Sequence, residues 1–90
     1  MNRRVEATIF GYVQGVSFRY YTRQQAQRLG VSGWAHNLAD GRVEVFAYGE
    51  SSAVYKLCAW LHEGPSLAHV TNVQCQAVTQ PNSPEGFGIG

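Results

Sequence analysis

The stretch RRVEATIFGYVQGVSFRYYTRQQAQRLG, residues 3–30, contains two hydrophobic periodicities joined by a short loop. From Arg3 to Gly11, apolar and polar residues alternate, which is the period of a half-buried β-strand. From Phe18 to Leu29, apolar residues recur at helical spacing, and Ser17 and Gly30 are suitable residues for the start and end of a helix. The sequence therefore predicts a strand, a loop and an amphipathic helix in this order.

The rest of the chain repeats this pattern of strands and a helix separated by turn residues. The expected elements are a strand over 33–38, an Asp-Gly turn over 39–41, a strand over 42–48, a helix over 51–63, a β-like segment over 69–78, a loop over 80–86 and a short edge strand over 87–89. The order βαββαβ describes an α+β fold, the ferredoxin-like split βαβ sandwich. We expect an antiparallel sheet with two helices on one face and water on the other.

Composition limits the classes of protein to which the chain can belong. Its 90 residues are 44% hydrophobic and 14% charged, which is typical of one small globular domain, here residues 1–90. The net charge of +1 argues against a basic nucleic-acid or membrane-surface binder, and the strand over 42–48 lacks the aromatic motif of RNA-recognition domains. No apolar run long enough for a membrane span or a secretory signal is present, which favours a cytoplasmic location.

Two cysteines, Cys58 and Cys75, lie in apolar patterns, and we interpret them as reduced core thiols. A single bridge between them is the alternative. A metal site is also conceivable, because Cys58 and His62 lie four residues apart on the expected helix and His69 and Cys75 follow, but core packing is the favoured interpretation. The chain has no phosphate-binding or dinucleotide-binding glycine motif and no obvious pair of carboxylates. We therefore expect chemistry without a metal, a covalent nucleophile or an acid–base pair.

The segment Gln14–Phe18 connects the first strand directly to the N-terminus of a helix, and Arg19 lies in its first turn. Successive backbone N–H groups in such a loop form a concave site for anions, and the helix N-terminus adds partial positive charge. A guanidinium would add a forked set of donors suited to phosphate. Anion binding is one interpretation, and an ordinary connecting loop with a surface arginine is the other.

Residues 11–19, GYVQGVSFR, closely resemble the first signature of the acylphosphatase family, G-x-V-Q-G-V-x-F-R. Residues 33–43, GWAHNLADGRV, are similar to its second signature. The resemblance implies a monomeric enzyme without a cofactor that hydrolyses acyl phosphates to a carboxylate and inorganic phosphate. Phosphate would then also act as a product inhibitor.

The resemblance also implies roles for individual residues. Arg19 matches the phosphate-binding arginine, and Asn37 matches the asparagine that orients the attacking water. The backbone cradle for the phosphate corresponds to Gln14, Gly15, Val16, Ser17 and Phe18. An amide is not basic, so Asn37 is expected to orient the water while a phosphate oxygen accepts its proton. Without the resemblance, Asn37 would be interpreted as a strand residue that hydrogen-bonds its own backbone.

Two departures from the family pattern leave other functions open. Family members commonly end in Phe-x-Ile-Arg, whereas residues 87–90 are FGIG, and His36 occupies a position where Lys or Arg is common. The missing arginine predicts lower activity or stability, and His36 makes the local charge dependent on pH. One alternative is a non-catalytic anion- or metabolite-binding domain of the same fold. Another is the acylphosphatase-like domain of larger maturation proteins that handle carbamoyl phosphate, against which the length of the chain argues.

Overall fold

The computed structural model describes residues 1–79 and 84–90, so residues 80–83 of the loop expected over 80–86 lie outside the described part. The elements are β1 (Asn2–Tyr12), α1 (Phe18–Leu29), β2 (Ser32–Asn37), β3 (Val43–Glu50), α2 (Ser51–Glu63), β4 (His69–Ala77) and β5 (Phe87–Ile89). Both helices and the last strand have the expected bounds. The other strands differ from the expected ones by one or two residues at their ends.

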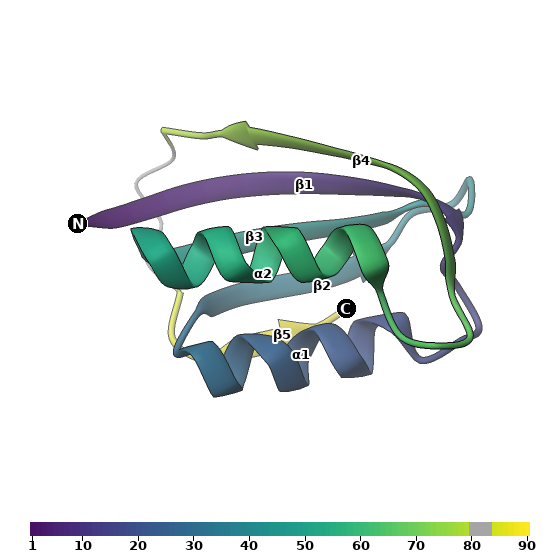
Figure 1. Ribbon diagram of the computed structural model, residues 1–90, viewed down its shortest axis with the longest axis horizontal. Coiled ribbons are helices and arrows are strands. Elements are labelled where there is room, and N and C mark those ends of the chain that lie inside the picture. The colour runs from purple at the N-terminus through teal and green to yellow at the C-terminus, as the bar shows by residue number, and fades with distance from the viewer. Residues whose placement is uncertain (80–83) are drawn as a thin grey trace.

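The strands of the described residues form one sheet in the order β4-β1-β3-β2-β5, and both helices lie on the same side of it (Figure 1). This confirms the ferredoxin-like α+β arrangement. The expectation of a fully antiparallel sheet is wrong at one edge, because β5 pairs with β2 in parallel. The chain leaves β4 at one edge of the sheet and returns at the opposite edge in the reverse direction. Because β1 and β2 are both antiparallel to β3, and β5 is parallel to β2, β5 runs in the same direction as β1 and β2 and opposite to β4.

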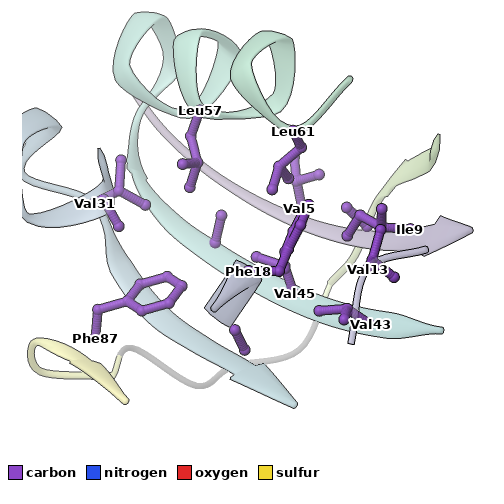
Figure 2. Close-up of a cluster of buried hydrophobic side chains, with 14 of the residues drawn as sticks. Val5, Ile9, Val13, Phe18, Val31, Val43, Val45, Leu57, Leu61 and Phe87 are labelled. Carbon is purple, nitrogen blue, oxygen red and sulfur yellow. The ribbon is translucent and has the colours of Figure 1, made fainter. Parts of the chain in front are cut away.

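The hydrophobic core lies between the sheet and the two helices. Figure 2 shows Leu57 and Leu61 of α2 above the strands that carry Val5 and Val45. The buried residues of α1 are Phe18, Thr22 and Ala26. Thr22 is the polar residue among them, and its hydroxyl donates a hydrogen bond to the Phe18 carbonyl at 2.8 Å. The periodicity of each helix therefore identified its buried face correctly.

The opposite face of the sheet is less open to water than expected. Phe46 lies on this face, yet it is only 1% exposed. The ring of Trp34, directly across from it on β2, stacks with Phe46 at a centroid distance of 5.8 Å, and His36 stacks on Trp34 at 4.3 Å. Cross-strand aromatic pairs of this kind stabilise a sheet and cover one another.

Cys75 is exposed, so its interpretation as a core thiol is wrong. It lies on β4, an edge strand, where a side chain has a neighbouring strand on one side only. Cys58 is half-buried on α2. Within the described part of the chain, neither helix is long and apolar enough to cross a membrane.

Gly11 allows β1 to leave its regular pairing with β4. The register shifts between Phe10 and Gly11, and Gly11 has a φ of 127°. A Cβ atom at this position would lie 2.1 Å from the backbone oxygen of His69. The close approach of two backbones therefore requires glycine.

We predict that Gly11→Ala lowers the free energy of unfolding by more than about 3 kcal/mol, because backbone strain and a backbone clash act together. Gly15→Ala is the matched control, since Gly15 has a φ of 75° but a Cβ atom there would meet nothing within 4 Å. Left-handed strain alone costs about 1–2 kcal/mol. Urea unfolding of both variants measures the difference, and equal losses would contradict the role given to the close approach.

Candidate active site

The C-terminal ends of β1, β2 and β5 lie at the same end of the sheet. Because β1 and β2 are both antiparallel to β3, and β5 is parallel to β2, all three strands run in the same direction (Figure 1). The loop after β1, the end of β2 at Asn37, and residues 89–90 are therefore brought to the same end of the molecule. Segments distant in the sequence thus meet where the N-terminus of α1 begins.

The loop between β1 and α1 is held by buried apolar side chains. Val13, Val16 and Phe18 are buried, and Figure 2 shows Val13 and Phe18 among the core side chains. Gly15 and Ser17 are exposed and have positive φ angles of 75° and 59°. Because the three buried side chains anchor the loop in the core, the backbone at Gly15 and Ser17 faces outward.

The N–H groups of this loop are available to a ligand. Among the hydrogen bonds of the described residues, none is donated by the N–H of Gly15, Val16 or Ser17. The first N–H groups of α1 also lack partners within the helix. A sequence of backbone donors with left-handed residues, followed by a helix N-terminus, is an arrangement that binds anions.

Ser17 occupies the N-cap position of α1, as expected, but its hydroxyl makes no capping hydrogen bond. The reason is its backbone conformation, with φ 59° and ψ 28°, whereas a capping side chain requires an extended backbone. Ser17 is therefore at the predicted N-cap position, but the prediction that its side chain caps the helix is wrong. Ser17 instead contributes the left-handed turn that joins the loop to the helix.

Gln14 connects this loop to the turn between β2 and β3. Its Nε2 donates to the Leu38 carbonyl at 2.7 Å and to the Arg42 carbonyl at 2.9 Å. The N–H of Leu38 donates to the same Arg42 carbonyl at 2.8 Å. Sequence reasoning placed Gln14 in the backbone cradle and missed this side-chain role, since the partners are more than twenty residues away.

The same turn is reinforced by an ion pair between Asp40 and Arg42, with an Nε–Oδ2 distance of 2.7 Å. The hydrogen bond from the Arg42 side chain holds the pKa of the Asp40 carboxyl below its usual value. The N–H of Arg42 also donates to Asp40 at 3.2 Å. Both residues are exposed or half-exposed, so the pair orders the turn more than it stabilises the fold.

The loop, the helix N-terminus and the end of β2 surround a cavity of about 370 Å³. Its lining residues are Val13, Gln14, Gly15, Ser17, Phe18, Arg19, Tyr20, Asn37 and Ile89. Both predicted catalytic residues and most of the predicted cradle thus share one cavity. Val16 is the one predicted cradle residue that does not line the cavity. Tyr20 and Ile89 were missed, and Ile89 joins the site only through the pairing of β5 with β2.

Arg19 is the charged member of this lining, and it is half-buried in the first turn of α1. Its Nη1 donates a hydrogen bond to the main-chain oxygen of Gly90. The N–H of Gly90 in turn donates to the Ala35 carbonyl at 3.0 Å. One nitrogen of the guanidinium is therefore oriented by a residue tied to β2, and the other N–H groups of the fork remain for a ligand.

Asn37 is exposed at the end of β2. Its side-chain amide makes no hydrogen bond to another described residue, so the interpretation that it caps its own backbone is wrong. The amide offers a donor and an acceptor to the cavity.

The described residues contain no group of three or more His, Cys, Asp or Glu arranged to hold a metal, and the metal alternative on Cys58 and His62 gains no support.

The family model of the acylphosphatases matches residues 5–89. The chain belongs to the acylphosphatase family. An acylphosphatase from Halorhodospira halophila is 52% identical over 97% of this chain and 94% of its own length. The structure of an acylphosphatase from Coxiella burnetii superimposes with a TM-score of 0.93 at 36% identity, covering 99% of this chain and 93% of that one.

Full-length HypF, in a phosphate- and nucleotide-bound form, contains a similar region. It matches with a TM-score of 0.90 and 26% identity, covering all of this chain and 12% of that one. The acylphosphatase fold therefore occurs both in chains of this size and as part of much larger ones.

We predict that Gln14→Glu lowers the free energy of unfolding by about 1–3 kcal/mol, because a carboxylate cannot donate to the two carbonyls that the amide joins. Gln24→Glu is the matched control, since Gln24 is exposed on α1 and donates only to the Tyr20 hydroxyl at 3.2 Å. Surface changes of this kind stay within about 0.5 kcal/mol. Chemical denaturation of the two variants provides the comparison, and equal effects would remove Gln14 from the positioning role.

We predict that Ser17→Gly raises the free energy of unfolding by about 1 kcal/mol, because glycine adopts the left-handed conformation without the steric cost borne by serine. Ser17→Ala is expected to change it by less than about 0.5 kcal/mol, because there is no capping hydrogen bond to lose. Thermal and urea unfolding measure both. A large loss in the alanine variant would show that the hydroxyl has a structural partner after all.

Proposed function

We propose that this chain hydrolyses the carboxyl–phosphate bond of small acyl phosphates, with Arg19 and Asn37 as catalytic residues. The single observation that carries the proposal is the shared cavity. A guanidinium, outward-facing backbone donors and an unpaired amide line it together, and they come from the ends of two strands and one helix. Membership in the acylphosphatase family supports the same reaction.

The phosphoryl group is proposed to lie on the cradle of residues 14–18, with Arg19 beside it. The backbone N–H groups and the helix N-terminus meet the phosphate oxygens, and the guanidinium fork supplies a fixed positive charge. Phosphoryl transfer passes through a loose transition state in which charge is spread over these oxygens, so positioning and charge stabilisation provide most of the catalysis. The cavity lining includes no acidic side chain that would repel the phosphate.

Asn37 is proposed to orient the attacking water. The water oxygen forms a bond to phosphorus as the bond from phosphorus to the acyl oxygen breaks. The electron pair of that bond leaves with the carboxylate. A phosphate oxygen takes the proton of the water, since the amide has no basic site.

The residue set suits an acyl phosphate better than a phosphate monoester. The leaving group is a stable carboxylate, so no general acid is needed. Uncatalysed hydrolysis of phosphate monoesters is far slower, so a catalyst must lower their activation barrier by a larger amount. An enzyme with one cation, backbone donors and one amide is therefore expected to discriminate strongly between the two substrate classes.

We further propose that residues 1–90 act as one domain and as a monomer, without a cofactor, in the cytoplasm. One chain supplies every residue in the proposed mechanism, which supports the monomer. The described elements share one sheet and one core, which supports the single domain. Inorganic phosphate is expected to inhibit by occupying the cradle.

We predict that the protein hydrolyses benzoyl phosphate in the presence of EDTA, and that Arg19→Ala abolishes both turnover and phosphate binding. Asn37→Ala is expected to lose about 10²–10³-fold in turnover while largely retaining phosphate affinity, because its amide contacts the water and not the phosphate. Steady-state hydrolysis and calorimetric titration with phosphate measure the two properties separately.

Two surface variants are the controls. Arg28→Ala removes an exposed arginine from the last turn of α1, and Asn72→Ala removes an exposed asparagine from β4. Neither residue lines the cavity, so both variants should match the wild type. Equal loss of phosphate affinity in Arg19→Ala and Asn37→Ala would contradict the division of roles. A folded wild type that binds phosphate without turnover would support the non-catalytic anion-binding domain instead.

A further inference from the structure

A second and larger cavity, of about 540 Å³, lies away from the proposed active site. It is bordered by α2, β1 and the edge strand β4, which lie next to one another in Figure 1. Both cysteines of the chain line it, together with His62 and Arg3. Neither cysteine lines the cavity that contains Arg19. The two cavities are therefore chemically distinct.

The fold brings the two cysteines together although they are seventeen positions apart in the sequence. Cys75 pairs directly with Ala7 of β1, and Ala7 is buried at 2% exposure under the helices. Residues directly opposite in an antiparallel pair place their side chains on the same face of the sheet. Cys75 is thus on the helix-facing side, where Cys58 follows the buried Leu57 on α2.

The two thiols line the same cavity, and they differ in their acidity. The Cys58 thiol and, to a lesser extent, the nearby His62 lower the pKa of Cys75 to about 7. The Cys75 thiol and burial raise the pKa of Cys58. The other titratable groups that line cavities with Cys75 are Arg3 on β1 and Tyr55 on α2, in the same cavity, and Glu6 on β1, in a smaller neighbouring one. Cys75 is therefore the thiolate of the pair near neutral pH, and Cys58 remains the thiol.

The two cysteines also differ in their exposure to solvent. Cys75 is exposed and accessible to a small molecule, whereas Cys58 is half-buried behind it. Thiolates are the reactive form of cysteine, and an exposed thiolate with a second cysteine beside it is the usual arrangement for thiol–disulfide exchange. His62, whose Nδ1 lies 3.0 Å from the Cys58 carbonyl oxygen, keeps the ring next to the pair.

We propose that Cys75 and Cys58 form a thiol–disulfide exchange site that reacts with small disulfides and closes an intrachain bond between β4 and α2. The Cys75 thiolate attacks one sulfur of the small disulfide, whose S–S bond breaks and releases one thiolate. Cys58 loses its proton to solvent and attacks the Cys75 sulfur, releasing the second. The two protein thiols lose two electrons in total, and the small disulfide is reduced to two thiols.

Closure of this bond should stabilise the protein without changing its catalysis. Both cysteines line one cavity, and closing the bond requires their sulfur atoms to approach to the bond length of about 2.0 Å. The bond would tie the edge strand to α2 and restrict the unfolded chain between residues 58 and 75. The inference does not depend on the proposed hydrolysis, since neither thiol lines the cavity with Arg19 and Asn37.

The test treats the reduced protein with oxidised glutathione and follows intact mass after acid quenching. We expect a transient adduct of one glutathionyl group on Cys75, then a species lighter than the reduced protein by two hydrogens. The melting temperature of that species should rise on the order of 10 °C. Cys58→Ser should stop at the Cys75 adduct and show no such rise, and Cys75→Ser should react slowly.

Alkylation of Cys75 by iodoacetamide provides an independent measurement on the wild type. Its rate should increase about tenfold between pH 6 and 8 and then level off, as for a thiol with a pKa of about 7. A rate that keeps rising toward about pH 9, as for an ordinary cysteine, would overturn the assignment. So would a wild type that stops at the adduct, forms covalent dimers, or reacts first at Cys58.

Discussion

The burial of three apolar side chains in and beside the loop between β1 and α1 positions the backbone of the proposed site. Val13, Val16 and Phe18 are drawn into the core, so Gly15 and Ser17 must turn outward. Burial of each anchor stabilises the fold by about 1.5–3 kcal/mol, so the three anchors together outweigh the cost of about 1–2 kcal/mol for one left-handed serine. Hydrophobic packing thus holds the backbone donors open to solvent without any ligand, and a preorganised site of this kind avoids reorganisation during the reaction.

The position of the loop matters only because other segments are tied to it. Gln14 joins it to the turn after β2, and Gly90 joins Arg19 to the far strand β5 and to Ala35. These polar links cross the end of the sheet where three strands point in the same direction. Gln14 thus ties the loop to the turn that follows Asn37, and Gly90 ties Arg19 to β2, while the remaining N–H groups of Arg19 and the Asn37 amide stay free for the substrate.

The two cavities have different chemistry. The proposed active site is lined by one cation and uncharged donors, while the cavity under α2 is lined by apolar side chains, two thiols, His62 and Arg3. The larger cavity does not contain the loop of outward-facing backbone donors that is proposed to bind phosphate. The residues that line each cavity, and not its volume, distinguish the proposed active site from the cysteine cavity. The cysteine pair lies where β4, at the edge, leaves a side chain both near a helix and open to solvent.

The local elements and the family could be predicted from the amino-acid sequence. Periodicities of two and 3.6 residues located the strands and both helices, because the burial of one face is a local property of each segment. The two signatures predicted Arg19, Asn37 and residues 14–18 as the site, and the structure brings all of these residues except Val16 to one cavity. Which segments become neighbours emerged from the folded arrangement. The parallel pairing of β5, the link made by Gln14, the place of Ile89 in the site and the cavity shared by Cys58 and Cys75 all depend on sheet order, and side-chain partners distant in the sequence leave no periodic signal.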